Sequence, residues 1–219
     1  QHAIKQSLGK KYDPDFILTS GLLSQAIVKQ IKSIKSSIVC LGSPRHNKAR
    51  MLLNKAQCCL VVPEAMIDEC VTLFKFSLTY AIQHKEQRFI WRLHPLMSFE
   101  KLKKYNSIFK KLPDNICLSE DNLDEDIKKC DSVLYRGSAA VVNAINAGLK
   151  PIYYQQSNDE LSIDPIYQQQ KGKDIVLNQE DLRFAFNKDI DTEVKQSLQN
   201  FAQDFYTPLN LKAIKKAML

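Results

Sequence analysis

The chain has 219 residues, a net charge of +7 and a pI near 9.0. Hydrophobic residues make up 44% and charged residues 25% of it, which excludes a disordered, collagen-like or coiled-coil protein. The positive charge is concentrated at the start. Residues 1–58 hold ten Lys or Arg against two Asp, and residues 59–219 hold 21 bases and 22 acids. This asymmetry predicts two parts, the first facing a negatively charged partner.

Short apolar runs alternate with longer amphipathic stretches along the sequence. The predicted strands are 16–19, 37–41, 58–62, 89–93, 116–118, 131–135, 151–154 and 175–177. The predicted helices are 22–31, 65–80, 98–112, 123–129, 138–147, 180–187, 193–205 and 209–219. Strands that alternate with helices favour an α/β fold, in which a parallel sheet has helices on both faces.

We therefore expect one complete Rossmann-like unit after the first quarter of the chain. Residues 1–57 are predicted to be the end of an N-terminal Rossmann-like domain, its last β-α-β unit, followed by a crossing segment. Residues 58–207 are predicted to form a C-terminal ligand-binding domain, and residues 208–219 a C-terminal helix.

The cysteines and histidines do not predict a metal site. None of the six cysteines forms a C-x-x-C pair, and the four histidines are far apart in the sequence. We expect small buried thiols in a reducing cytoplasm. The start has no signal-like segment, and the longest apolar run, 58–63, is too short to span a membrane.

Polar clusters follow three of the predicted strands, where a doubly wound sheet binds its ligands. They are Pro63-Glu64, Arg92-Leu93-His94-Pro95 and Arg136-Gly137-Ser138. In the last cluster, Gly137 permits a tight turn, Ser138 begins a predicted helix and Arg136 is a bidentate donor, which together suit a phosphate. A plain turn with a helix cap is the alternative reading. The Walker and G-x-G-x-x-G phosphate-binding motifs are absent.

Arg92 and His94 are two positions apart at the end of a predicted strand. Side chains at this spacing share a face, so both could bind one anion, although His94 could instead cap the next helix. The lysines of the segment 101–111 fit a solvated helix face. The aromatic residues are not interleaved with basic ones as in RNA-binding proteins, so no nucleic-acid partner is expected.

Several segments resemble bacterial surface-carbohydrate transferases of the GT-B type, which have two Rossmann domains. Related groups are the CDP-glycerol glycerophosphotransferases, the capsule polysaccharide transferases and the CMP-sialic acid polymerases. The segments are Gln1-His2-Ala3, Gly42-Ser43-Pro44-Arg45, Val62-Pro63-Glu64 with Glu69-Cys70, Arg92-Leu93-His94-Pro95, Tyr135-Arg136-Gly137-Ser138 and Gly148-Leu149-Lys150-Pro151.

The resemblance implies a role for particular residues. His94 and Ser138 would hold the donor phosphate, and His2 would be the base or an acceptor-side residue. The sequence departs from the family at Ala3, at Ala139 in place of a second Ser, and at Asn143 in place of a Glu. The full expected set for the nucleotide and its phosphate is Glu64, Arg92, His94, Pro95, Arg136, Gly137, Ser138, Ala139 and Asn143. Gly42, Ser43 and Arg45 are expected in the cleft between the domains.

The first hypothesis is thus a metal-independent glycosyltransferase or glycerophosphotransferase of surface polysaccharide biosynthesis. Its donor would be a CMP-, CDP- or UDP-linked sugar, with no other cofactor, and its acceptor a glycan or a lipid-linked glycan. It would be cytoplasmic, with peripheral contact to the anionic inner face of the membrane. The alternatives are a non-catalytic nucleotide- or phosphosugar-binding module, a nucleotide-sugar epimerase of the same fold, and, from charge alone, a nucleic-acid-binding domain.

Overall fold

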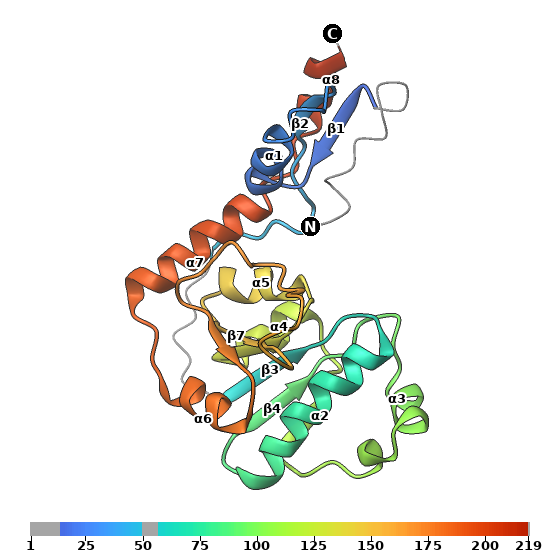
Figure 1. The fold of residues 1–219 in the computed structure, drawn as a ribbon, viewed down its shortest axis with the longest axis vertical. Helices are drawn as coiled ribbons and strands as arrows, with labels where there is room; N and C mark the ends of the chain where they lie inside the picture. Colours follow the sequence, from blue (N-terminus) through green and yellow to red (C-terminus); the bar gives the residue numbers. More distant parts are fainter. Residues whose placement is uncertain (1–13, 50–56, 219) are drawn as a thin grey trace. The chain divides into compact units, whose positions relative to one another are not determined.

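The computed structural model describes residues 14–49 and 57–218 and divides them into two compact units (Figure 1). The first unit holds residues 14–49 and 200–218, and the second holds residues 57–199. The boundary near the C-terminus therefore falls inside helix α7 (Thr192–Phe205), earlier than the position after residue 207 expected from the sequence. The reason is a backbone connection: Thr207 donates to the carbonyl of Ser20, and its own carbonyl accepts from Ser43.

The first unit is built on a β-α-β motif. Strands β1 (Phe16–Thr19) and β2 (Ser37–Cys40) are parallel and are joined by helix α1 (Leu22–Lys29). The C-terminal helix α8 (Leu211–Met218) lies against β2. The predicted β-α-β unit is confirmed for the described residues, and its place at the end of an N-terminal Rossmann-like domain stays a prediction.

The second unit is a parallel six-stranded sheet in the order β5-β4-β3-β6-β7-β8. Its strands are β3 (Cys58–Val62), β4 (Arg88–Trp91), β5 (Ile116–Leu118), β6 (Ser132–Tyr135), β7 (Lys150–Tyr154) and β8 (Asp174–Val176). The chain winds outward from β3 to β5, returns to the middle as β6, and winds outward again to β8. The direction of winding therefore reverses between β3 and β6, as in Rossmann folds.

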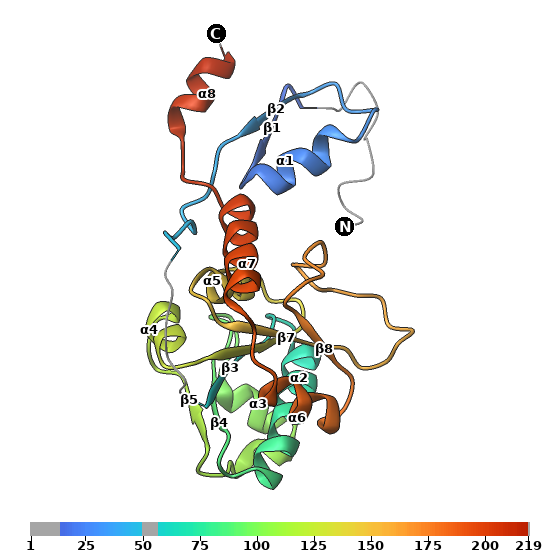
Figure 2. The same cartoon turned by 90° about the vertical axis from the view of Figure 1, so that its left-hand side faces the viewer.

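Helices cover both faces of this sheet, as predicted (Figures 1 and 2). They are α2 (Ile67–Gln83), α3 (Phe99–Tyr105) and α6 (Gln179–Asn187) on one face and α4 (Leu123–Lys128) and α5 (Ala140–Asn146) on the other. All five residues of β3 are buried, because it is central and covered on both sides. On the α2 face, Phe74 stacks on Trp91 with ring centroids 4.3 Å apart.

The structure shortens some predicted elements. The predicted helix 98–112 is interrupted at Asn106, where α3 gives way to a 3-10 helix, η1 (Ser107–Lys110). Asn106 has an extended backbone, and its side chain accepts from the Ile108 amide at 3.1 Å, so it ends one helix and caps the next. In addition, β4 ends at Trp91 and α5 begins only at Ala140.

Candidate functional site

The strand order brings two of the predicted clusters together. Strands β3 and β6 are neighbours, with Val62 paired to Tyr135 at their carboxyl ends. Glu64 and Gly137, which follow these strands, therefore meet at the edge where a doubly wound sheet binds its ligands. His94 follows β4, the next strand along this edge. We refer to this place as the switch-point edge.

Arg136 is a deeply buried charged group at the switch-point edge. Its side chain is 2% exposed and lies between two carboxylates. Nε donates to Glu69 at 2.5 Å, and the two terminal nitrogens donate to Glu160 at 2.5 and 3.3 Å. The guanidinium carbon also lies 5.6 Å from the ring centroid of Tyr154. Burial opposes the charge on Arg136, but the bonds to Glu160 and Glu69 outweigh it and raise its pKa.

This arrangement differs from the phosphate-binding role expected for Arg136. Its partners come from distant segments: Glu69 from the first turn of α2, and Glu160 from the connection between β7 and β8. The guanidinium group thus links α2, the end of β6 and this connection through its two ion pairs. The hydrogen bond from Arg136 in turn lowers the pKa of Glu160. Arg136 therefore holds the segments of the switch-point edge in place through its internal ion pairs with Glu69 and Glu160.

Glu64 and Gly137 are in close contact. A Cβ atom at residue 137 would lie 1.6 Å from Glu64 Oε1, so any other residue there requires the Glu64 carboxyl group to move. Burial raises the pKa of Glu64, with Glu69 adding to the effect and Arg136 and the Gly137 backbone opposing it. Within the described residues, Glu64 Oε1 is buried without a hydrogen-bond partner. It is therefore an acceptor for which residues 14–49 and 57–218 supply no donor.

Ser138 lies just before α5, whereas the sequence predicted that the helix begins at this residue; the alternative reading of Ser138 as the helix cap is wrong. The N-cap is Ala139, which already has helical backbone angles and has no side chain able to accept. Val141 donates to the Ser138 carbonyl at 3.3 Å, whereas the Ser138 hydroxyl has no partner among the described residues. Asn143, the expected counterpart of a family Glu, is half-buried within α5.

Arg92 and His94 have separate partners. Because β4 ends at Trp91, the strand alternation that predicted a shared anion site reaches neither residue. Arg92 forms an ion pair with the buried Asp126 at 2.7 Å. His94 Nδ1 accepts from the Leu96 amide at 3.2 Å, which leaves the ring proton on Nε2 as a donor.

The expected residues of the first unit contact its C-terminal segment. Gly42 has a φ of +81°, and a Cβ atom there would lie 2.1 Å from the Pro208 carbonyl oxygen. Ser43 is buried, and Arg45 donates to the Tyr206 hydroxyl at 3.5 Å. A place for Gly42, Ser43 and Arg45 in a cleft between domains stays a prediction. The expected base, His2, lies outside the described residues.

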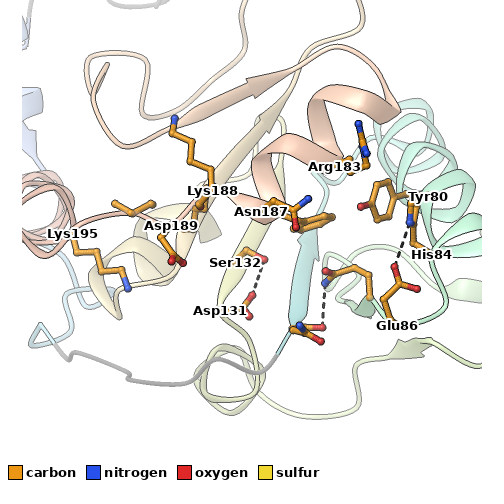
Figure 3. A pocket seen from close by; sticks show the side chains of 15 residues that line it. Tyr80, His84, Glu86, Asp131, Ser132, Arg183, Asn187, Lys188, Asp189 and Lys195 are labelled. Atoms are coloured by element: carbon orange, nitrogen blue, oxygen red, sulfur yellow. Dashed lines mark hydrogen bonds and ion pairs between the residues drawn. The ribbon is translucent and has the colours of Figure 1, made fainter.

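The opposite, amino edge of the same sheet contains a cavity of about 460 Å³ (Figure 3). No predicted site residue lines it. Two lysines that line the cavity are already in ion pairs. Lys150 and Lys188 both bind Asp174, at 2.8 and 2.7 Å. Lys150 also donates to the carbonyls of Ala185 and Lys188, which satisfies the end of α6. The expected site residues that follow β3, β4 and β6 thus lie at the other edge of the sheet, away from this cavity.

Residues 14–49 and 57–218 contain neither a metal-binding cluster nor a membrane-spanning helix. No three His, Cys, Asp or Glu side chains there are grouped so that they could bind a metal ion. No helix among these residues has both the length and the apolar composition needed to cross a bilayer.

No protein-family model and no curated protein matches the sequence. Solved structures match the fold. The pneumococcal O-GlcNAc transferase GtfA, in complex with UDP and GlcNAc, has a TM-score of 0.57 at 14% identity, over 92% of this chain and 44% of that one. The glycosyltransferase SnogD from Streptomyces nogalater has a TM-score of 0.52 at 13% identity, over 92% and 56%.

A third similar structure has another activity. It is the Methanocaldococcus jannaschii UDP-GlcNAc 2-epimerase in complex with UDP-GlcNAc and UDP, with a TM-score of 0.53 at 13% identity, over 85% of this chain and 60% of that one. Taken together, the similarities show that the chain has the fold of about half of a GT-B glycosyltransferase. It spans about half the length of the structures it matches.

Proposed function

We propose that this chain binds a nucleotide sugar at the switch-point edge and is the donor-binding half of a glycosyltransferase or glycerophosphotransferase of surface polysaccharide biosynthesis. The observation that carries the proposal is the reversal of strand order between β3 and β6, which gathers Glu64, Gly137 and Ser138 at one edge. Similar folds that were solved with UDP or a UDP-sugar support the ligand class.

The proposed roles follow from the groups left without partners. His94 Nε2–H and the Ser138 hydroxyl donate to phosphate oxygens, and Glu64 accepts from a hydroxyl group of the ribose or the sugar. During transfer the phosphate becomes the leaving group, and donors already in position stabilise its growing negative charge. In this proposal neither a metal nor a separate cofactor takes part.

The proposed acceptor is inferred from the excess of basic residues at the start of the chain. The basic segment 1–58 would face an anionic membrane surface or a charged glycan, with a glycan or lipid-linked glycan as acceptor. The enzyme would then act in the cytoplasm at the inner face of the membrane. His2 is the proposed base that deprotonates the acceptor hydroxyl.

Calorimetry with UDP, CDP and CMP tests the proposal. We expect the wild-type chain to bind at least one of them, and His94→Ala to weaken the binding about tenfold or more, since a hydrogen bond to a charged group contributes about 1.5–3 kcal/mol. His84→Ala is the matched control, because His84 lines the cavity at the opposite edge. The proposal would be contradicted if the wild-type chain bound none of the three nucleotides. It would also be contradicted if His94→Ala and His84→Ala lost the same amount of affinity.

A nucleotide-sugar epimerase is the second candidate, favoured by the similarity to the archaeal 2-epimerase. Incubation with UDP-GlcNAc distinguishes the two, because an epimerase converts the free nucleotide sugar to its 2-epimer without an acceptor. The transferase proposal predicts no such product. Nucleotide binding with neither epimerisation nor transfer would instead support a non-catalytic binding module.

A further inference from the structure

Cys58 and Cys130 lie beside each other at the amino edge of the second unit's sheet. Cys58 opens β3, and Cys130 lies two residues before β6, the neighbouring strand. Both side chains are 1% exposed, and their sulfur atoms are 3.7 Å apart. A disulfide bond is about 2.05 Å long, so the two atoms would need to approach by about 1.6 Å.

The surrounding backbone holds this pair together and separates it from the other thiols. The amide of Asp131 donates to the Cys58 carbonyl at 3.0 Å, which fixes the two segments side by side. Cys59 points to the other face of the sheet, because side chains alternate along a strand, and it packs in the α2 core. Cys70 donates to the Glu64 carbonyl at the opposite edge.

The two thiols differ in their affinity for a proton. The hydrogen bond that Cys130 donates lowers the pKa of Cys58; burial opposes this effect, and Arg88 adds to it. The same interaction, together with burial, raises the pKa of Cys130. Cys58 is thus the thiol that ionises first, and Cys130 keeps its proton.

A cavity lies beside the chain segments that carry this pair. The cavity of about 460 Å³ at the amino edge is lined by Gln57 and Asp131, which adjoin Cys58 and Cys130 in the chain (Figure 3). Neither cysteine lines the cavity and both are 1% exposed, so a solute such as hydrogen peroxide meets the sulfur atoms only when the amino edge opens locally.

We propose that Cys58 and Cys130 are a redox pair that hydrogen peroxide converts to an intramolecular disulfide. The Cys58 thiolate attacks the peroxide O–O bond, which breaks to leave a sulfenic acid on Cys58 and release hydroxide. The Cys130 sulfur then attacks the Cys58 sulfur. The departing hydroxyl leaves with the Cys130 proton as water, so that two thiols and one peroxide give one disulfide and two waters. The new bond ties the start of β3 to the turn between α4 and β6.

Mass spectrometry on the full chain tests the proposal. The folded protein is treated with hydrogen peroxide, unfolded and alkylated, and its peptides are mapped. We expect a peptide pair joined between Cys58 and Cys130, lighter by two hydrogens and separated by dithiothreitol. Cys130→Ser should abolish the link and leave Cys58 as a sulfenic acid that dimedone traps. Cys70→Ser, a change at another buried thiol, should retain the link.

Exposed Cys117 serves as an internal measure of the peroxide dose. The proposal is overturned if Cys117 is fully oxidised while Cys58 and Cys130 are still fully alkylated. It is overturned equally if the Cys58–Cys130 link forms only after the protein has been unfolded. The wild-type peptide map decides between these outcomes and the expected one, even if a serine variant folds poorly. Nucleotide binding is not part of this readout, so the redox proposal and the proposed function fail separately.

Discussion

Replacing Arg136 by methionine tests whether its charge holds the switch-point edge together. The substitution keeps an unbranched side chain of similar length but leaves Glu69 and Glu160 without a cation. Removing one partner of a buried ion pair typically costs about 3–5 kcal/mol. The side chains of Glu69 and Glu160 are 24% and 21% exposed, so water relieves part of the loss. We therefore expect the free energy of unfolding to fall by about 3 kcal/mol, near the lower end of this range.

Urea unfolding followed by tryptophan fluorescence measures this loss. Trp91 is the single tryptophan of the chain, is fully buried and stacks on Phe74 in the second unit, so its signal reports on that unit. Arg183→Met is the matched control, because Arg183 is 51% exposed and its ion pair with Glu180 is long, at 3.8 Å. We expect this control to change the free energy of unfolding by less than about 0.5 kcal/mol.

The loss in the free energy of unfolding caused by Arg136→Met should depend on pH. In the wild type, Arg136 lowers the pKa of Glu160 in the folded state. This stabilisation is complete above the pKa of Glu160 in the unfolded chain and is lost as the pH falls through the lowered value. The variant lacks this contribution, so the gap to the wild type should stay constant from pH 7 down to about pH 4.5 and narrow as the pH falls further. A gap below about 1 kcal/mol, or one that acidification widens, would refute the reasoning.

The other predictions concern single side chains whose surroundings are well defined. Gly137→Ala should push the flexible end of the Glu64 side chain aside and lower the stability of the second unit by less than about 1 kcal/mol in urea unfolding, because Glu64 Oε1 has no hydrogen bond to lose among the described residues; a loss of several kcal/mol would contradict this reasoning. Gly42→Ala should cost at least about 2 kcal/mol, measured by thermal unfolding, because φ is +81° and the added Cβ atom meets a backbone carbonyl. Asp164→Asn leaves the buried ammonium of Lys173 without its charge partner and should cost about 3–5 kcal/mol; a loss within error in a urea titration would argue against this ion pair.

The sequence was sufficient to predict the layered fold. Strands such as 58–62 are wholly apolar because both faces of the sheet are covered, and this pattern can be recognised without any tertiary information. The reversal of winding between β3 and β6 could not be derived, because strand order depends on contacts between distant segments. The break at Asn106 was missed because its side-chain bond to Ile108 competes with an otherwise continuous helical pattern.

The candidate site was predicted only in outline. The residues after β3, β4 and β6 were identified correctly as lying at the carboxyl edge, since this follows from strand direction alone. The partners of Arg136 could not be foreseen, because Glu69 and Glu160 lie 67 and 24 residues away in the sequence. The contact between Cys58 and Cys130, 72 residues apart, likewise carries no local signal. The role of a buried arginine depends on the carboxylates that surround it. Hydrophobic periodicity in the sequence does not show which carboxylates these are.

A crystal structure of the chain soaked with UDP tests the central claim most directly. The account predicts that the diphosphate lies at the switch-point edge, with phosphate oxygens about 2.7–3.2 Å from His94 Nε2 and the Ser138 hydroxyl. It also predicts that Glu64 accepts a hydrogen bond from a hydroxyl of the ligand. A nucleotide bound instead in the cavity at the amino edge of the sheet, away from His94 and Ser138, would contradict the account.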